Sequence, residues 1–184
     1  MPKSGVKCEL EAVVRDKDGK VLEVVKKSPD LILANFRKII LWGVLGAANS
    51  TDNQILVSVK DENGNNRNLA VWWTGERKFT YTPGPNRLKI VVGTGSTPPT
   101  RDDYCLANKV AETTSVSVLQ GEDYVAYSAA IALPNETTIT EAGFLNQYST
   151  EPPGSAWIML LRDVFTSVNV PAGGSIGITY KITI

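Results

Sequence analysis

The sequence predicts a mainly β fold, an antiparallel β-sandwich or jelly-roll-like barrel with one buried N-terminal helix. The first observation is that most segments alternate apolar and polar residues, which is the period of a half-buried strand. The second is that turn-forming clusters, such as Asp18-Gly19 and Pro134-Asn135, divide these segments at short intervals. The third is that residues 31–46 depart from this pattern, because apolar residues cover most of a helix surface there.

Residues 6–27 are predicted to form a β-hairpin at the start of the chain. Cys8 and Leu10 alternate with polar residues along the first strand, and Asp18-Gly19 supplies the turn that joins it to the returning strand. No apolar segment of the kind found in secretory signals precedes this hairpin, so we expect a protein that is made in the cytoplasm and has no membrane-spanning segment.

The helix predicted for residues 31–46 begins after Asp30 as its N-cap and ends at Gly46 as its C-cap. Its polar stripe is narrow and consists of Asn35, Arg37 and Lys38. We expect such a helix to be largely buried, either against an open end or face of the sheets or against a neighbouring subunit. The hairpin and the helix, residues 1–48, are expected to pack on a β-sandwich domain of residues 49–184 as one cooperative unit.

A second hairpin is predicted around residues 61–65, where a calcium loop also has to be considered. Asp61, Asn63 and Asn65 match the first half of an EF-hand loop. However, the glycine of this segment, Gly64, comes two residues too early, and Trp72 stands where the bidentate glutamate is required. The segment is therefore predicted to be a turn, and no metal-ligating residue is assigned.

Aromatic residues after this turn form a candidate interface. Trp72 and Trp73 are adjacent, so in a strand their side chains point to opposite faces, and one of them is expected to face outward or into an interface. Phe79 and Tyr81 follow in a basic, loop-like stretch that we interpret as a solvated hairpin tip and not as a nucleic-acid patch. An exposed tryptophan stacks on sugars or anchors a partner protein, and the sequence does not separate these roles.

The composition excludes several classes of enzyme. The chain has no histidine, which rules out Ser-His-Asp and Cys-His arrangements and any zinc site that needs histidine. Its 19 basic and 19 acidic residues balance, so the totals indicate no general attraction to nucleic acid or to anionic membranes. Cys8 and Cys105 are isolated in sequence and are expected to be small buried apolar residues, with a disulfide between them left open.

No catalytic or cofactor-binding residue is predicted. The Gly93-Thr94-Gly95 turn lacks the third glycine and the directly following helix that a dinucleotide site needs. Glu141, Arg162 and Asp163 are expected to form a charged cluster, which we interpret as structural ion pairs, with catalytic carboxylates as the alternative. The small residues that follow Glu141 predict a β-bulge or a close approach of two backbones.

The second half of the chain resembles a known family. Residues 91–110, with the sequence VVGTGSTPPTRDDYCLANKV, are similar to the G-x-G-x-x-x-P-x-x-x-D-x-x-L stretch of small structural proteins of tailed phages and related viruses. Residues 138–146, TITEAGFLN, and residues 160–184, which begin LLRDVF, resemble later stretches of the same family in the same order. Residues 30–47 resemble the helix that often precedes them.

The resemblance implies a non-enzymatic virion protein of the tail, collar or capsid surface. Its expected partners are copies of itself and other virion proteins, without specific nucleic acid, membrane or cofactor. Two alternatives remain from the residues themselves: a filament or pilus-like subunit that assembles by strand exchange, and a carbohydrate-binding β-sandwich module. In a virion protein and in a filament subunit alike, the alternating final strand, GSIGITYKITI, is expected to bury its isoleucine face.

Overall fold

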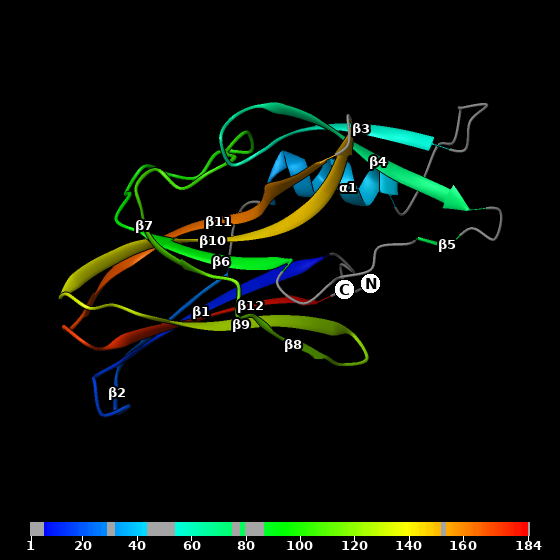
Figure 1. Ribbon diagram of the computed structural model, residues 1–184. Helices are drawn as coiled ribbons and strands as arrows, with labels where there is room; N and C mark the ends of the chain where they lie inside the picture. The colour runs from blue at the N-terminus through cyan, green and yellow to red at the C-terminus, as the bar shows by residue number, and fades with distance from the viewer. Residues whose placement is uncertain are drawn as a thin grey trace.

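The computed structural model describes residues 6–28, 32–43, 54–74, 78–79, 87–151 and 154–183. Within these ranges the chain forms twelve strands and one helix (Figure 1). In chain order these are β1 (Lys7–Arg15), β2 (Val21–Lys27), α1 (Ala34–Gly43), β3 (Gln54–Lys60), β4 (Asn66–Thr74), β5 (Lys78–Phe79), β6 (Leu88–Gly93), β7 (Lys109–Thr113), β8 (Ser117–Gln120), β9 (Tyr124–Ala132), β10 (Thr137–Glu151), β11 (Gly154–Val170) and β12 (Ser175–Thr183).

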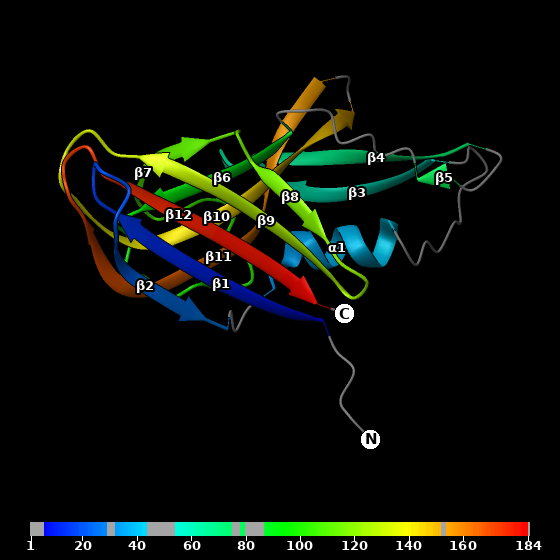
Figure 2. The ribbon, with the colours of Figure 1, turned by 90° about the horizontal axis from the view of Figure 1, so that it is seen from below.

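The strands form two antiparallel sheets, which confirms the predicted mainly β fold. The first sheet has the order β2-β1-β12-β9-β8, and the second has the order β3-β4-β10-β6-β7, with β11 paired to β10 and β5 paired to β4. Among the described strands, neither sheet closes into a barrel. The two sheets lie in separate layers, with β1, β12 and β9 facing β6, β10 and β11 (Figures 1 and 2).

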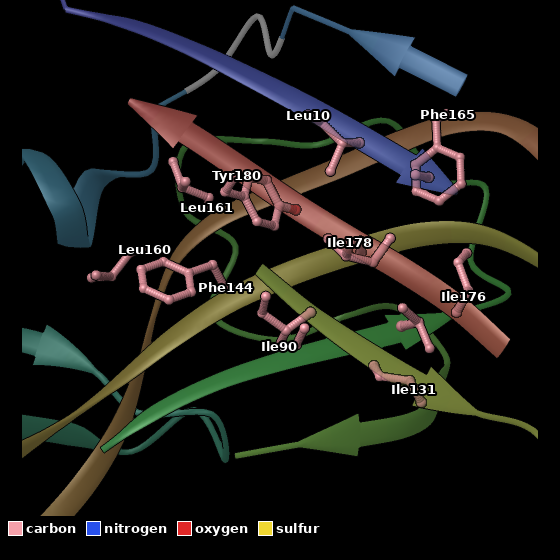
Figure 3. Close-up of a cluster of buried hydrophobic side chains, with 14 of the residues drawn as sticks. Leu10, Ile90, Ile131, Phe144, Leu160, Leu161, Phe165, Ile176, Ile178 and Tyr180 are labelled. Carbon is pink, nitrogen blue, oxygen red and sulfur yellow. The ribbon is translucent and has the colours of Figure 1, made fainter. Parts of the chain in front are cut away.

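The inner faces of the two sheets share one hydrophobic core. From the first sheet, Leu10, Ile178 and Tyr180 point into it, and Ile90 and Phe144 reach it from the second sheet (Figure 3). The ring of Phe144 stacks on Tyr127 at 4.4 Å between centroids and tilts against Tyr180 at 6.3 Å. Each fully buried aliphatic side chain contributes about 1.5–3 kcal/mol relative to exposure, so this shared core is the main source of stability.

The first hairpin forms as predicted. Gly19 takes the positive φ of 83° that the turn requires, and the Asp16 carboxylate accepts hydrogen bonds from the backbone N–H groups of Asp18 and Lys20. β1 pairs with β2 on one side and with the whole of β12 on the other. The N-terminal hairpin therefore belongs to the same sheet as the end of the chain, and the division at residue 48 stays a prediction.

The final strand is an internal strand of its sheet. β12 pairs with β1 and with β9 along its full described length. Ile176, Ile178, Tyr180 and Ile182 are buried, whereas Thr179 and Lys181 on the other face are half-buried. The expected burial of the isoleucine face is thus seen within a single chain, and Ile184 lies outside the described residues.

The helix differs from the prediction. The described part of α1 begins at Ala34, and both Asp30 and Gly46 lie outside the described residues. Ile40 is 40% exposed, and Asn35, expected on the polar stripe, is buried. Asn35 is buried because its side-chain amide donates to the Lys60 carbonyl at 3.0 Å and its side-chain oxygen accepts from the Lys60 N–H. The helix is therefore half-buried along its described side chains, and it packs against β3 and β11.

A second, smaller apolar cluster lies on the outer face of the second sheet. It consists of Leu33, Val91, Leu106, Leu145 and Met159. Leu106 belongs to the loop of residues 94–108, which crosses this face and which we call the crossing loop. The turn of residues 61–65 reaches the same face, because the Glu62 N–H donates to the Trp157 carbonyl at 3.0 Å. This covered outer face holds Glu141 and Arg162, two of the three charged residues that the sequence singled out.

Candidate functional site

Glu141 stands at an irregularity of β10. The register with β11 shifts between Ile139 and Glu141, which confirms the predicted bulge. At Gly143 it is side chains that come close, because an added Cβ would meet Met159 Cε at 2.7 Å and Val91 Cγ2 at 3.0 Å. The bulge and the small residues together allow the crossing loop to settle over the strand.

The Glu141 carboxylate binds the backbone of the crossing loop. Its Oε1 accepts hydrogen bonds from the N–H groups of Gly95 and Asn108 at 2.9 and 2.8 Å. Its Oε2 accepts from the Ala107 N–H at 3.1 Å. A Cβ at Gly95 would collide with Glu141 Oε1, so only glycine lets the backbone come this close. One carboxylate thus holds both ends of the crossing loop.

Arg162 completes this arrangement from β11. Its Nε and Nη2 donate to Glu141 Oε2 at 3.1 and 2.9 Å. Its Nη1 donates to Asp103 Oδ2 at 2.6 Å, and its Nη2 also donates to the Thr97 carbonyl at 3.1 Å. Asp103 in turn accepts from the N–H and hydroxyl of Thr100. We call Glu141, Arg162 and Asp103 the loop clamp.

The electrostatics of the loop clamp favour fixed charges. Burial alone would raise the pKa of Glu141, but the hydrogen bonds from Asn108 and Arg162 outweigh it, so the pKa lies below its usual value. Burial would likewise raise the pKa of Asp103, but the hydrogen bonds from Thr100 and Arg162 outweigh it, so this pKa is also lowered. Both carboxylates are therefore ionised at neutral pH, which suits ion pairing and is the wrong protonation state for a general acid.

Asp163 does not join the loop clamp. Consecutive strand residues face opposite sides, so Asp163 points from β11 into the shared core while Arg162 points outward. Burial, and then the charge of Asp163, raise the pKa of Tyr180 well above its usual value. Burial and the same carboxylate raise the pKa of Cys8 to about 12. The predicted cluster of three residues is thus a pair, Glu141 and Arg162, with Asp163 on the other face.

A second charged group lies beside the loop clamp on the same outer face. Lys89 is buried on β6, and its Nζ lies 2.8 Å from Glu62 Oε2 and 4.6 Å from the centre of the Trp157 ring. Glu112 lies 3.5 Å from the same ammonium and 2.7 Å from Lys109. Lys89 therefore joins the turn of residues 61–65 to the sheet, a role that nothing in the local sequence predicts.

A recess of about 300 Å³ separates the crossing loop from the turn of residues 61–65. Val91, Leu145 and Met159 form its floor, and charged or polar groups from Glu62 and Lys109 stand at its rim. Cys105 lines it as well, and both cysteines are free thiols. Of the polar groups around it, Glu62 pairs with Lys89 and Lys109 pairs with Glu112. Burial raises the pKa of the Cys105 thiol, which disfavours the thiolate that a cysteine nucleophile needs.

In the turn of residues 61–65, the protein's own donors engage both oxygens of Asp61. Asp61 Oδ1 accepts from the N–H groups of Asn63 and Asn65, and its Oδ2 lies 2.7 Å from Arg67 Nε. Gly64 has the positive φ of 81° that such a turn requires. Within the ranges that the structure describes, no group of three or more Cys, Asp or Glu residues could hold a metal ion.

The aromatic candidates are placed only by their backbone. Trp72 and Trp73 lie on β4, and Phe79 lies on β5, where it pairs opposite Trp73. The structure describes only the backbone of Trp72, Trp73 and Phe79, and Tyr81 lies outside the described residues. The assignment of these four residues to an interface stays a prediction.

The loop clamp was only half visible in the sequence. Asp103 was missed as a member, because 59 positions separate it from Arg162 and nothing in the intervening pattern links them.

The chain matches no family model, no curated protein and no solved structure. In the described part of the chain, no helix has the length and apolar character needed to cross a membrane.

Proposed function

We propose that the chain is a non-enzymatic structural protein of a tailed virus, a decoration, collar or tail component that assembles with copies of itself and with other virion proteins. The proposal places it in the virion after synthesis in the host cytoplasm. It involves no cofactor, no specific nucleic acid and no membrane.

The loop clamp is the observation that carries this proposal. The three stretches that resemble the virion family, residues 91–110, 138–146 and 160–184, are far apart in the sequence. The loop clamp joins all three. Glu141, in the second stretch, accepts a hydrogen bond from the Gly95 N–H of the first stretch. It also accepts one from Nη2 of Arg162, which belongs to the third stretch. A series of motifs that meets in one buried network is a more specific resemblance than the same motifs scattered over a surface.

The chemistry of the loop clamp favours a structural role over a catalytic one. A catalytic carboxylate needs a free oxygen near substrate and a pKa matched to its task. Here both oxygens of Glu141 accept hydrogen bonds from the protein, and its side chain is fully buried. The carboxylate instead fixes the position of the crossing loop on the outer face.

We further infer that the two sheets form a β-sandwich in which the helix covers part of the second sheet. The shared core and the separate layers support the sandwich. The contacts of α1 with β3 and β11, together with the buried Leu33 and Asn35, support the placement of the helix. The half-exposed face that includes Ile40 remains available to a neighbouring subunit.

The experiment that tests the proposal is the size of the purified full chain in solution. We expect discrete homo-oligomers by sedimentation velocity, and rings, tubes or regular clusters by negative-stain electron microscopy. A chain that stays monomeric over a wide range of concentration would contradict self-assembly. Turnover of a hydrolase substrate that is abolished by Glu141→Gln would contradict the non-enzymatic role, and glycan binding lost in Trp72→Ala and Trp73→Ala would favour the carbohydrate-binding alternative.

A further inference from the structure

The two edges of the first sheet carry most of the exposed apolar side chains that the structure describes. Five of the eight large exposed apolar residues lie on its two edge strands and are between 43% and 62% exposed: Val21, Leu22 and Val24 on β2, and Val118 and Leu119 on β8. Neither strand has a ladder partner on its outer side among the described residues. An edge strand with apolar side chains is a template for pairing with another chain.

The directions of the two edge strands are the same. Each neighbouring pair in the order β2-β1-β12-β9-β8 is antiparallel, so four reversals leave β2 and β8 running in one direction (Figure 2). When the β8 edge of one copy meets the β2 edge of the next with the sheet faces aligned, the two strands are therefore parallel.

Val24 and Leu119 lie on the same face of the sheet. Residues paired across neighbouring strands share a face. Val24 of β2 pairs with Val13 of β1. Leu119 of β8 is linked to Glu9 of β1 by successive pairs across β9 and β12, through Ala126 and Lys181. Val13 and Glu9 have the same parity on β1, whose other face is the buried one. Both residues are therefore on the outer face, and one contact between the two edges shields both from water.

The register extends over the whole of β8. Setting Val24 beside Leu119 places Leu22–Val25 of β2 beside Ser117–Gln120, the four residues of β8, with Glu23 beside Val118 and Val25 beside Gln120. Glu122 lies beyond β8, in the turn where the Gly121 N–H donates to the Tyr124 carbonyl, so the contact rests on strand pairing and apolar side chains and not on charge.

We propose that the β8 edge of one copy pairs in parallel with the β2 edge of the next, so that the first sheet continues from copy to copy. This contact is head-to-tail, and it uses both apolar edges in one interface, whereas a two-fold contact through either edge leaves the other exposed. Because each added copy presents a new free edge, the assembly grows into a ring or a filament. The inference rests on the self-assembly in the proposed function and names its surface.

A complementation experiment tests the contact. In the full chain, Val24→Lys blocks the β2 edge and Leu119→Lys blocks the β8 edge, since a lysine on an edge strand opposes pairing. Each variant alone is expected to be monomeric by sedimentation velocity. An equimolar mixture is expected to form one-to-one heterodimers and nothing larger, because one intact β8 edge meets one intact β2 edge.

A matched control and contrary outcomes separate this inference from the proposed function. Val110→Lys changes an exposed apolar residue on β7, away from both edges of the first sheet, and should assemble like the wild type. If a lysine variant loses its cooperative thermal transition, Val24→Thr and Leu119→Thr replace the pair, with the same pattern expected in weaker form. Assembly of both edge variants at wild-type size would overturn the inference and leave the proposed function standing, and dimers of one variant alone would indicate a two-fold contact instead. A monomeric wild type would overturn both.

Discussion

Arg162 and Glu141 form a buried ion pair between β11 and β10, with Nη2 and Oε2 2.9 Å apart and side chains 3% and 0% exposed. A buried pair of this kind gains little net stability over apolar residues of the same size, but removing one partner leaves an uncompensated charge. The pair is also the attachment point of the crossing loop. Its removal should therefore affect the stability of the whole fold and the local order of the loop.

Glu141→Gln is expected to lower the free energy of unfolding by about 3 kcal/mol, at the low end for a broken buried pair because Asp103 still contacts Arg162. The glutamine amide would also direct donors at the N–H groups of the crossing loop. Urea unfolding followed by fluorescence measures the loss. Limited trypsin digestion should in parallel show faster cleavage after the exposed Arg101 in the loop.

The matched control for this variant is Glu11→Gln. Glu11 pairs with Lys26 on the exposed face of the first sheet, with nitrogen and oxygen 2.7 Å apart. An exposed pair of this kind adds little, so neither the urea midpoint nor the cleavage rate should change measurably. Equal effects of the two substitutions would show that the loop clamp is not a buried network.

Acid should weaken the fold through Glu141 and Asp103. Their pKa values are lowered in the folded chain, so the unfolded chain binds protons more readily and stability falls as the pH decreases. Their contribution to stability is complete at pH values above the ordinary pKa, which is 4.5 for Glu and 3.8 for Asp. It is lost as the pH falls from there through the lowered pKa of the folded chain. Urea midpoints between pH 7 and pH 2 should decline in this window, with a shallower decline in Glu141→Gln, and an unchanged slope would contradict the assignment.

The two thiols should differ in reactivity. Cys8 is buried on β1, opposite Ile182 of β12, and burial followed by the Asp163 charge raises its pKa to about 12. Cys105 is half-buried at the recess, and burial raises its pKa more modestly. A thiol reagent at pH 8 should therefore label Cys105 quickly in the native protein, and both cysteines in denaturant. Cys105→Ser should abolish the fast phase, and rapid labelling of Cys8 would contradict its place in the sheet.

The sequence was informative where a rule links neighbours. Alternation predicted β1 and β12, and the Asp-Gly pair predicted the turn at Gly19 and the returning strand β2, because both patterns are local. The same alternation rule, applied to Arg162 and Asp163, predicts opposite faces for them, although the two were first grouped in one cluster. Asp103 and Lys89 were out of reach because their partners are distant in sequence.

The helix shows a different limit of sequence reasoning. Apolar composition indicates that a helix has a buried face, but it does not say which apolar residues point to that face. Ile40 was expected in the core and is 40% exposed, whereas Asn35 was expected in water and is buried because backbone groups of β3 satisfy its amide. A short polar side chain with a full set of partners can thus take a core position that composition assigns to an apolar residue.

Leu33 and Ile40 give a matched test of this placement. Leu33 is fully buried in the outer-face cluster, and Leu33→Ala should lower the free energy of unfolding by about 2–5 kcal/mol. Ile40→Ala should lower it by less than about 1 kcal/mol, because a half-exposed side chain leaves no closed cavity. Urea unfolding of the two variants gives the comparison. A larger loss for Ile40→Ala would restore the deeply buried helix that the sequence predicted.

The final strand allows a test of whether its burial is internal or exchanged. β12 lies between β1 and β9, so deletion of residues 175–184 would divide the first sheet and expose the inner faces of both neighbours. We expect the truncated chain to lack a cooperative thermal transition, because the core loses Ile176, Ile178 and Tyr180 together. The measurement is circular dichroism with heating.

Point variants on β12 test the same geometry in a chain that stays folded. Ile178 faces the core and its neighbour Thr179 faces outward, where its hydroxyl lies 3.0 Å from the Ser128 hydroxyl. Ile178→Ala should therefore cost about 2–5 kcal/mol in urea unfolding, and Thr179→Ala about 1 kcal/mol for one lost exposed-face hydrogen bond. A truncated chain that remains a folded monomer while wild-type assembly disappears would show instead that copies donate this strand to one another, because the core of each copy would then be complete without its own β12.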